Sequence, residues 1–332
     1  MQNLTYIIKR LLLALLIVFG VSMIIYFLIR MMPVDYITSK FSSQIQGGGM
    51  TQEDLNRILA LYGLDDNSFM GIVKGYFEWF GNFMRGDMGV SFQYGDKVEN
   101  VIGRYMGTSF IISFISLILQ MLIAIPLGIK CACNQYGKFD YFCTFFCMVS
   151  MAFPSFFLGN MVIKWFAVDL GWFETGGIAT AGSGFTGFRL FLDQAWHLVL
   201  PMFVLTVLSI GGLMRYTRTN TLEVLNADYI RTARAKGLSE NKVVYKHVFR
   251  NTLIPLVTQL AFTLPSLFGG AMITETIFDI PGIGKVAYDA IQIGDIPLAM
   301  GYNMFIAVLT VAGILLADLM YAVVDPRVKI RK

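Results

Sequence analysis

Long apolar runs without charge alternate with polar stretches along this sequence. Each run is close to the ~20 residues that a helix needs to cross ~30 Å of hydrocarbon at ~1.5 Å per residue. Because backbone polar groups in lipid must be satisfied within the segment, we expect each run to be a transmembrane helix. The runs that lack Asp, Glu, Lys and Arg are Leu11–Ile29, Met106–Ile129, Tyr141–Ile163, Gln194–Met214, Asn251–Thr274 and Ile296–Ala317. The predicted fold class is an all-α membrane protein with six transmembrane helices.

Composition supports the membrane class, and the charges suggest an orientation. Of the 332 residues, 56% are hydrophobic and 14% are charged, whereas soluble domains average about 25% charged residues. Most Lys and Arg residues fall on the side that holds both chain ends, including Lys9, Arg10, Lys329, Arg331 and Lys332. Lys and Arg are enriched in cytoplasmic loops, so we expect both termini in the cytoplasm. The net charge of +4 reflects this asymmetry and gives no reason to expect a nucleic-acid partner.

Polar residues are sparse within the apolar runs and mark a candidate path for a solute. The path residues predicted in this way are Gln120, Asn160, Gln259, Glu275 and Asn303. The pair of broken, charged midplane helices that is typical of many ion-coupled carriers is not recognisable in the sequence. Prolines inside the runs permit kinks. A kinked bundle with a weakly polar interior favours a wide path for a variable solute over an ion filter.

The sequence shows no clear pattern of a metal, catalytic or nucleotide-binding site. Cys143 and Cys147 share a helix face that could suit a soft metal. However, neither they nor Cys131 and Cys133 are accompanied by a His ligand set, so we interpret all four as packing residues and expect no metal site. No nucleophile and base fall together within the predicted helices. The glycines are not followed by the Lys-Ser/Thr of a phosphate-binding loop. We therefore expect a non-catalytic protein that binds no cofactor itself.

The long segment after the first apolar run contains a predicted amphipathic helix. From about residue 67 onward, apolar residues such as Phe69, Ile72, Tyr76 and Phe80 recur at helical spacing, with charged residues between them. An aromatic-rich helix of this kind could lie flat in the membrane interface. It could equally pack against the protein's own helices, because periodicity does not separate these two arrangements.

The basic stretch of residues 215–250 has the pattern of two helices separated by a glycine. A first helix is expected up to Gly237, which is placed to stop it in a left-handed turn. Ser239 is then a good N-cap for a second, short helix, and Leu238 and Val243 occupy the positions of a hydrophobic staple. Charge runs often face only water or lipid headgroups. Here the two helix signals, the small residues Ala233 and Ala235 and the glycine together favour a docking surface for a soluble partner.

These residues resemble the ATPase-docking loop of ABC importer permeases, in the version found in oligopeptide, dipeptide and nickel importers. The general motif begins with Glu-Ala-Ala, whereas Gly237 places Arg231-Thr-Ala there, and Pro255 lies further downstream than the general spacing. The run Arg-Thr-Ala-Arg-Ala-Lys-Gly-Leu is nevertheless similar to the peptide and nickel version. Further segments that resemble this family are 6–34, 63–66, 79–92, 275–286 and 325–328.

This resemblance implies a type I ABC importer transmembrane domain and, within it, the first (B-type) permease subunit of a peptide importer. Its partners would be a second homologous permease subunit, two ABC ATPase subunits that use ATP and Mg²⁺, and an extracytoplasmic solute-binding protein. All would assemble at a prokaryotic cytoplasmic (inner) membrane. The residues implied to contact the ATPases are Arg231, Ala233, Arg234, Ala235, Lys236, Gly237, Leu238, Ser239, Val243, Lys246 and His247.

The implied domain organisation has two parts. Residues 1–95 would hold the first transmembrane helix and a structured outer loop. Residues 96–332 would hold the permease core of five transmembrane helices, with a coupling loop at 215–250.

Other functions stay open from sequence alone. Within the family, nickel or another metal complex is an alternative solute. An ion-coupled secondary transporter would move its solute without an ATPase. A membrane scaffold would use the same loop to bind a partner without any solute flux.

Overall fold

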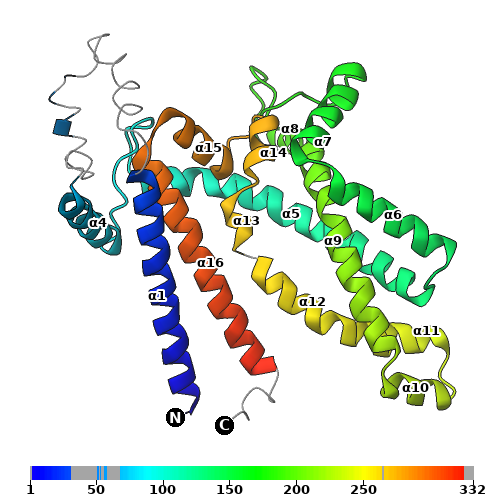
Figure 1. The fold of residues 1–332 in the computed structure, drawn as a ribbon. Coiled ribbons are helices and arrows are strands. Elements are labelled where there is room, and N and C mark those ends of the chain that lie inside the picture. Colours follow the sequence, from blue (N-terminus) through cyan, green and yellow to red (C-terminus); the bar gives the residue numbers. More distant parts are fainter. Residues whose placement is uncertain are drawn as a thin grey trace. The chain divides into compact units, whose positions relative to one another are not determined.

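The computed structural model describes residues 2–30, 51, 53, 56–57, 68–263 and 265–324. The described chain consists of helices joined by loops (Figure 1), with an isolated antiparallel bridge between Val90 and Lys97. Contacts divide the chain into two compact units. One comprises Met1–Met106 and Val286–Lys332, and the other comprises Gly107–Lys285. The division into residues 1–95 and 96–332 that the resemblance implies stays a prediction.

Four described helices are long and apolar enough to cross a membrane. They are α1 (Gln2–Arg30), α5 (Val98–Cys133), α9 (Val199–Leu225) and α16 (Ile296–Val324). A bent pair adds a fifth candidate, in which α6 (Lys138–Ala152) is followed at 99° by α7 (Ser155–Val162) and the π-helix η1 (Ile163–Asp169). The all-helical membrane class is therefore confirmed. The described residues contain four or five candidate spans where the sequence predicted six.

Prolines explain where the apolar runs depart from continuous helices. Phe153 precedes Pro154 and has an extended backbone with φ −73° and ψ 125°, because a proline disfavours helical geometry in the residue before it. The run Asn251–Thr274 was predicted as one helix, and this is wrong. It is divided among α12 (Phe249–Thr263), α13 (Ser266–Gly269) and α14 (Met272–Ile277). Pro265 lies at the first break, where it cannot donate a helical hydrogen bond.

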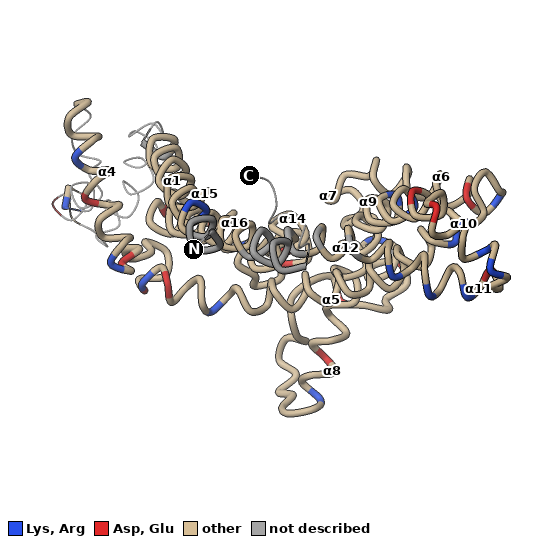
Figure 2. The backbone as a smooth tube through the Cα atoms, turned by 90° about the horizontal axis from the view of Figure 1, so that it is seen from below, with Lys and Arg blue, Asp and Glu red and all other residues tan. Residues whose placement is uncertain are grey.

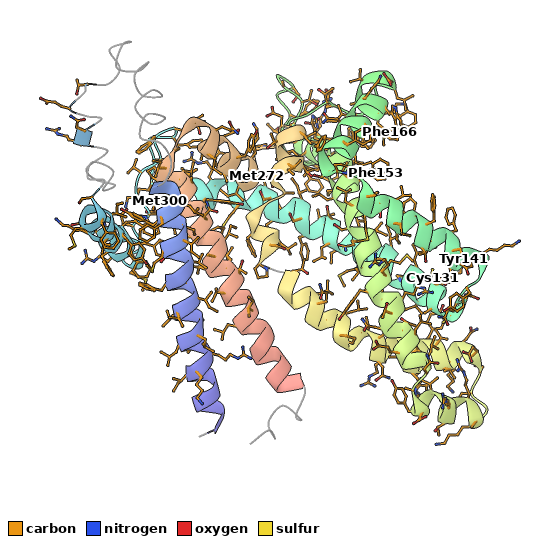
Figure 3. The ribbon with its side chains drawn as sticks, in the orientation of Figure 1. Cys131, Tyr141, Phe153, Phe166, Met272 and Met300 are labelled. Atoms are coloured by element: carbon orange, nitrogen blue, oxygen red, sulfur yellow. The ribbon has the colours of Figure 1, made fainter. Side chains whose placement is uncertain are left out.

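In the unit Gly107–Lys285, helices α6 and α9 pack closely against each other. A Cβ atom added to Gly211 of α9 would lie 2.8 Å from the carbonyl oxygen of Cys147, so this approach of the two backbones requires a glycine. Cys131 (labelled in Figure 3), Cys143 and Cys147 are buried in the surrounding apolar cluster. These three cysteines are packing residues, as predicted, whereas the fourth is exposed.

A buried ion pair joins the same two helices. Arg218 of α9 donates from Nε to Asp140 Oδ1 and from Nη2 to Asp140 Oδ2, in both cases at 2.7 Å. The Asp140 side chain is 4% exposed, and the backbone N–H of Tyr136 donates to it at 3.0 Å. The bidentate geometry and this third hydrogen bond offset the hydration that the carboxylate loses on burial.

Asp140→Asn is expected to lower the free energy of unfolding by roughly 2–4 kcal/mol, because the Arg218 guanidinium then lacks its counter-ion in a partly buried position. The measurement is thermal unfolding of the purified protein in detergent. Glu240→Gln is the matched control, since it removes one partner of an exposed pair with Arg234 and should cost no more than about 1 kcal/mol. Equal losses in the two variants would show that burial of the Asp140 pair does not determine its contribution.

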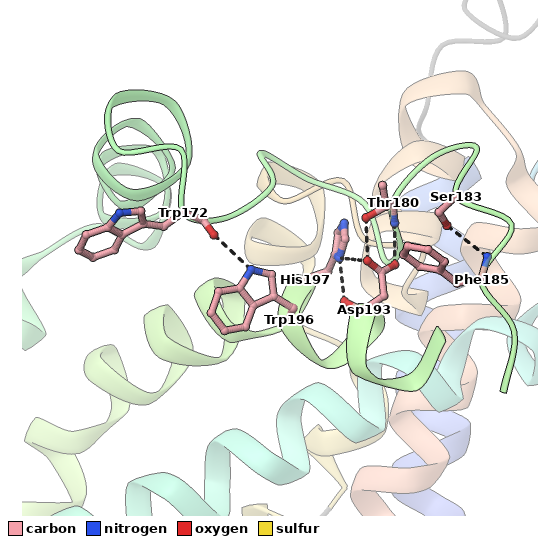
Figure 4. A network of polar contacts seen from close by, with 7 residues as sticks. All are labelled: Trp172, Thr180, Ser183, Phe185, Asp193, Trp196 and His197. Carbon is pink, nitrogen blue, oxygen red and sulfur yellow. Dashed lines mark hydrogen bonds and ion pairs between the residues drawn. The ribbon is translucent and has the colours of Figure 1, made fainter. Parts of the chain in front are cut away.

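The stretch after η1 is irregular, as predicted, until α8 (Gly187–His197) begins. Figure 4 shows how this stretch is held. Thr180 donates to the Asp193 carboxylate from its backbone N–H at 2.8 Å and from its hydroxyl at 2.7 Å. These hydrogen bonds lower the pKa of Asp193, so its carboxylate stays ionised well below neutral pH. Trp196 of α8 also donates from Nε1 to the Trp172 carbonyl at 3.2 Å, so this bond and those of Thr180 hold the loop against α8. The His197 ring contacts the Asp193 carbonyl through Nδ1 at 2.8 Å within α8 itself.

In the other unit, the predicted amphipathic helix is present as α4 (Phe69–Met84) and packs on α1 (Figure 1). Tyr76 is 2% exposed, and its hydroxyl lies 2.7 Å from Ser22 Oγ. Tyr76 shares an apolar cluster with Tyr26 of α1 and with Met300, which lies near the start of α16 (Figure 3). One face of α4 therefore packs against the protein's own helices, which was one of the two arrangements left open.

A buried carboxylate fixes the turn between α15 (Ile283–Ile293) and α16. Asp295 accepts hydrogen bonds from Ser91 Oγ at 2.5 Å, from the Gln93 N–H at 3.0 Å and from the Leu298 N–H at 3.2 Å. The segment before α5 is thereby tied to the beginning of α16.

Candidate functional site

The basic loop between α9 and α12 is built from two helical segments around Gly237. The first segment, α10 (Asp228–Ala235), ends in a turn in which Gly237 has φ 77°. Glycine adopts this left-handed conformation without the steric cost of a side chain. The Gly237 N–H donates to the Arg234 carbonyl at 2.9 Å, and the Leu238 N–H donates to the Ala233 carbonyl at 3.4 Å. This is the Schellman pattern of a helix C-terminus, and the predicted glycine stop is confirmed.

A small apolar core holds the two segments together. Ile230 and Ala233 of α10 pack with Val243 and Val248 of the second segment, and all four residues are at most 7% exposed. This core is also contacted by the side chains of Val224, Leu225 and Leu238. Burial of an aliphatic side chain of this size stabilises a fold by ~1.5–3 kcal/mol. The loop is therefore a folded element attached to the end of α9.

The second segment differs from the predicted short helix. α11 (Glu240–Lys242) continues through the π-helical turn η2 (Val243–Val248) directly into α12, so the helical run extends to Thr263. Ser239 lies at the N-cap position, but its side chain makes no capping hydrogen bond. Its carbonyl instead accepts from the Val243 N–H at 3.0 Å. At the other side of the loop, α9 extends to Leu225, so residues 215–225 belong to that helix.

Most residues implied to contact an ATPase lie on the surface of this element, and Figure 2 shows several Lys and Arg positions along α10 and α11. The exposed members are Arg231, Arg234, Ala235, Lys236, Gly237, Ser239 and Lys246. The partly buried members are Leu238 and His247, and the buried members are Ala233 and Val243. Sequence reasoning missed two aromatic residues of this surface, Tyr229 at 49% and Tyr245 at 76% exposure. A tyrosine suits either a core or a surface, so the pattern gave no signal for them.

An ion pair spans the glycine turn. Arg234 donates from Nε to Glu240 Oε2 at 3.1 Å and from Nη2 to Glu240 Oε1 at 2.7 Å. The guanidinium lowers the pKa of the Glu240 carboxyl. The pair is therefore fully charged above the ordinary Glu pKa of about 4.3 and is lost as the pH falls through the lowered value. Because both side chains are exposed, the pair contributes at most about 1 kcal/mol, and the apolar core and turn geometry determine the shape of the element.

One of the five predicted path residues lines a pocket in the unit Gly107–Lys285 that has both polar and apolar side chains in its walls. Gln120 of α5 donates through Nε2 to the Ser209 carbonyl of α9 at 2.9 Å. The pocket has a volume of about 250 Å³, and its polar lining consists of Ser113, Ser116, Gln120, Ser209, Thr263 and Ser266. Four helices that are distant in sequence, α5, α9, α12 and α13, therefore converge on an uncharged cavity rich in hydroxyl groups.

The other four predicted path residues lie outside this pocket. Asn160, Gln259 and Asn303 are exposed. The side-chain amides of Asn160 and Asn303 donate to carbonyls of their own helices, at 2.8 Å in both cases. The structure thus places these three on surfaces of the described chain, and Glu275 in its interior.

Glu275 is 1% exposed and organises a buried turn. Its Oε1 accepts hydrogen bonds from Ser109 Oγ at 2.7 Å and from the Ala271 N–H at 2.9 Å, and its Oε2 accepts from the Lys285 N–H at 3.0 Å. Ser109 Oγ in turn accepts from the Ile283 N–H at 2.8 Å. This one carboxyl group therefore joins α5, the start of α14 and the start of α15.

The sequence of this chain is similar to those of known membrane transport proteins. Residues 124–330 match the family described as binding-protein-dependent transport system inner membrane component. The chain is 39% identical to the oligopeptide transport system permease protein AppB of Bacillus subtilis, over 98% of this chain and 99% of the relative. It is 32% identical to a putative peptide permease protein of Brucella suis, with the same coverage. It is 30% identical to the dipeptide transport system permease protein DppB of Alkalihalophilus pseudofirmus, again over 98% and 99% of the two chains. The chain therefore belongs to the family of binding-protein-dependent transport system inner membrane components.

Proposed function

We propose that this chain is the first permease subunit of an ATP-driven peptide importer and forms part of the path of peptides across the bacterial inner membrane. Family membership makes the chain a non-catalytic permease component of that membrane. The observation that carries the choice of peptide is the full-length similarity to AppB, which is named as an oligopeptide permease. The similarity to DppB, named as a dipeptide permease, supports the same class of solute.

The folded element around Gly237 is proposed to dock on the ATPase subunits. Its exposed basic residues Arg231, Arg234 and Lys236, together with Lys246, support this assignment. ATP favours closed ATPase subunits, and their closure would move the groove that holds the element. Because the element is packed on α9 and continuous with α12, its movement would shift the bundle from inward-open to outward-open. The coupling requires that the two states differ in the free energy of docking.

The same family membership supports the proposed assembly. A member of a binding-protein-dependent ABC family works with ATPase and binding-protein partners in general. In the proposed complex, this chain pairs with a second, homologous permease subunit. Two ATPase subunits, which use ATP and Mg²⁺, lie on the cytoplasmic side, and a solute-binding protein docks on the opposite side. Both termini would then be cytoplasmic, and α12, α13 and α14 would together make a further crossing, which brings the number to six.

The hydroxyl-lined pocket with Gln120 is proposed to be part of the path. Hydroxyl and carboxamide groups can both donate and accept hydrogen bonds, so they can pair with the backbone amides that all peptides share. The polar lining carries no charged side chain, and it would therefore not select for the charge of a peptide's own side chains. For Asn160, Gln259 and Asn303, a role in the path stays a prediction.

Reconstitution tests this function. The complex that co-purifies with this chain is placed in liposomes, the binding protein and a radiolabelled peptide are added, and accumulation inside is measured. We expect accumulation that requires ATP and stops when the ATPase subunits are left out. Uptake by this chain alone in response to an ion gradient would overturn the coupling to ATP. ATP-dependent uptake of a nickel complex without uptake of any peptide would overturn the choice of solute.

A further inference from the structure

Helix α4 carries an apolar stripe that its packing on α1 leaves uncovered. Met70, Phe77 and Met84 follow one another at intervals of seven residues, which places them on one side of the helix. They are 74%, 59% and 61% exposed, and the neighbouring Phe69 is 77% exposed. A contiguous exposed apolar surface marks a contact with another protein or with a membrane.

The stripe is one of three distinct faces of α4. The face against α1 contains Tyr76 and the partly buried residues Ile72, Trp79 and Phe80. The polar face consists of Lys74, Glu78, Asn82 and Arg85, and Lys74 Nζ lies 3.7 Å from Glu78 Oε1. A helix on the surface of a soluble protein needs only an apolar face toward the core and a polar face toward water. Neither packing on α1 nor contact with water explains the third face of α4, which is apolar and exposed.

The contacts between α4 and α1 indicate how deep α4 lies in the membrane. The candidate membrane span of α1 is Ile8–Leu28, and Tyr76 contacts Ser22 and Tyr26 within it. At ~1.5 Å per residue, Ser22 lies ~9 Å inside the C-terminal end of this span. One leaflet of the hydrocarbon core is ~15 Å deep. The Tyr76 side of α4 is therefore level with lipid acyl chains, and not with the water beyond the headgroups.

We propose that α4 is embedded in the membrane leaflet at the C-terminal end of α1, with Met70, Phe77 and Met84 against phospholipid acyl chains. In Figure 1, α1 runs along the page while α4 is seen nearly end-on, so α4 lies across the span and along the plane of the leaflet. The polar face, with Lys74 and Glu78, is directed toward the headgroups. This placement goes beyond the transport function and does not depend on which solute is carried.

Spin labelling of the assembled complex in nanodiscs of phosphatidylethanolamine and phosphatidylglycerol tests the proposal. The background is Cys133→Ser, because Cys133 is exposed whereas the other three cysteines are buried. Nitroxides are attached at Phe77→Cys and, as a matched control ~100° around the same turn, at Glu78→Cys. Collision rates with oxygen, which concentrates in lipid, and with a water-soluble nickel chelate are measured by power saturation.

At Phe77→Cys, the collision rate with oxygen should exceed that with the nickel chelate several-fold. At Glu78→Cys, the ratio of the oxygen rate to the chelate rate should be lower. The depth at Phe77→Cys should match that of a label at Ile24→Cys, an exposed position within the α1 span. Equal access of the chelate to Phe77→Cys and Glu78→Cys would place the stripe in water. Low collision rates with both reagents at Phe77→Cys would place it against another protein. Either result overturns the proposal and leaves the reconstitution test of transport unaffected.

Discussion

Gly237→Asp is expected to abolish ATP-driven uptake while the protein remains folded and inserted. A Cβ atom at Gly237 would meet no other atom within 4 Å, so the subunit itself has room for the side chain. The cost to the fold is that of a left-handed backbone, about 1–2 kcal/mol for an ordinary residue and less for Asp. In the proposed ATPase groove, however, the carboxylate would lose its hydration, which costs several kcal/mol. Each ~1.4 kcal/mol weakens docking about tenfold.

Gly237→Asn is the control for this prediction. Asn is close to Asp in size and also tolerates the left-handed conformation, but it carries no charge. We expect it to retain most of the uptake, with both variants present in the membrane in amounts equal to the unmodified chain. The measurements are uptake of a radiolabelled peptide and the ATPase subunits recovered with the purified chain. Normal uptake by Gly237→Asp would overturn the docking role of this turn.

Glu275→Ala is expected to reduce the free energy of unfolding by roughly 3–9 kcal/mol, because three donors on separate segments lose the Glu275 acceptor, at about 1–3 kcal/mol each. These donors are the Ser109 hydroxyl and the N–H groups of Ala271 and Lys285. Total stabilities of ~5–15 kcal/mol are usual, so a loss of this size should lower the amount of protein in the membrane as well as its melting temperature. The measurements are immunoblotting of membranes and thermal unfolding in detergent.

Asp279→Asn provides the comparison for Glu275. Its carboxylate is 72% exposed and pairs with the Lys285 ammonium at 2.7 Å, so its loss should change the stability by no more than about 1 kcal/mol. Glu275→Gln keeps one carbonyl acceptor, so its loss of stability should lie between those of Glu275→Ala and Asp279→Asn. If Glu275→Ala retained normal abundance and melting but lost uptake, Glu275 would act in the path, as the sequence first suggested.

Local chemistry made several features of this protein predictable from its sequence. The apolar runs predicted helices because backbone groups in lipid leave few alternatives, and the predicted family is confirmed by the full-length relatives. The stop at Gly237 and the amphipathic α4 were also predictable, since each depends on residues within a few positions of one another. The same reasoning predicts a docking surface on one short stretch of chain, and this stays a prediction.

The features that sequence reasoning missed depend on contacts between distant residues. Arg218 and Asp140 are 78 positions apart, and nothing in either neighbourhood indicates the pair. Ser116 and Ser209 were not singled out because a hydroxyl in an apolar helix can bond to its own backbone. They become informative only where α5, α9, α12 and α13 converge on one pocket. The division of the run Asn251–Thr274 likewise depends on Pro265 together with the contacts of Glu275.

If the element around Gly237 docks as proposed, the continuous helical run from Glu240 to Thr263 would act as a lever. At ~1.5 Å per residue its three consecutive segments span about 36 Å, so a rotation of ~5° about one end displaces the other by ~3 Å. One end of this lever lies at the turn of Gly237, and the other contributes Thr263 to the hydroxyl-lined pocket. A short movement of the docked end would therefore change the width of the pocket directly, without a relay of side chains between them.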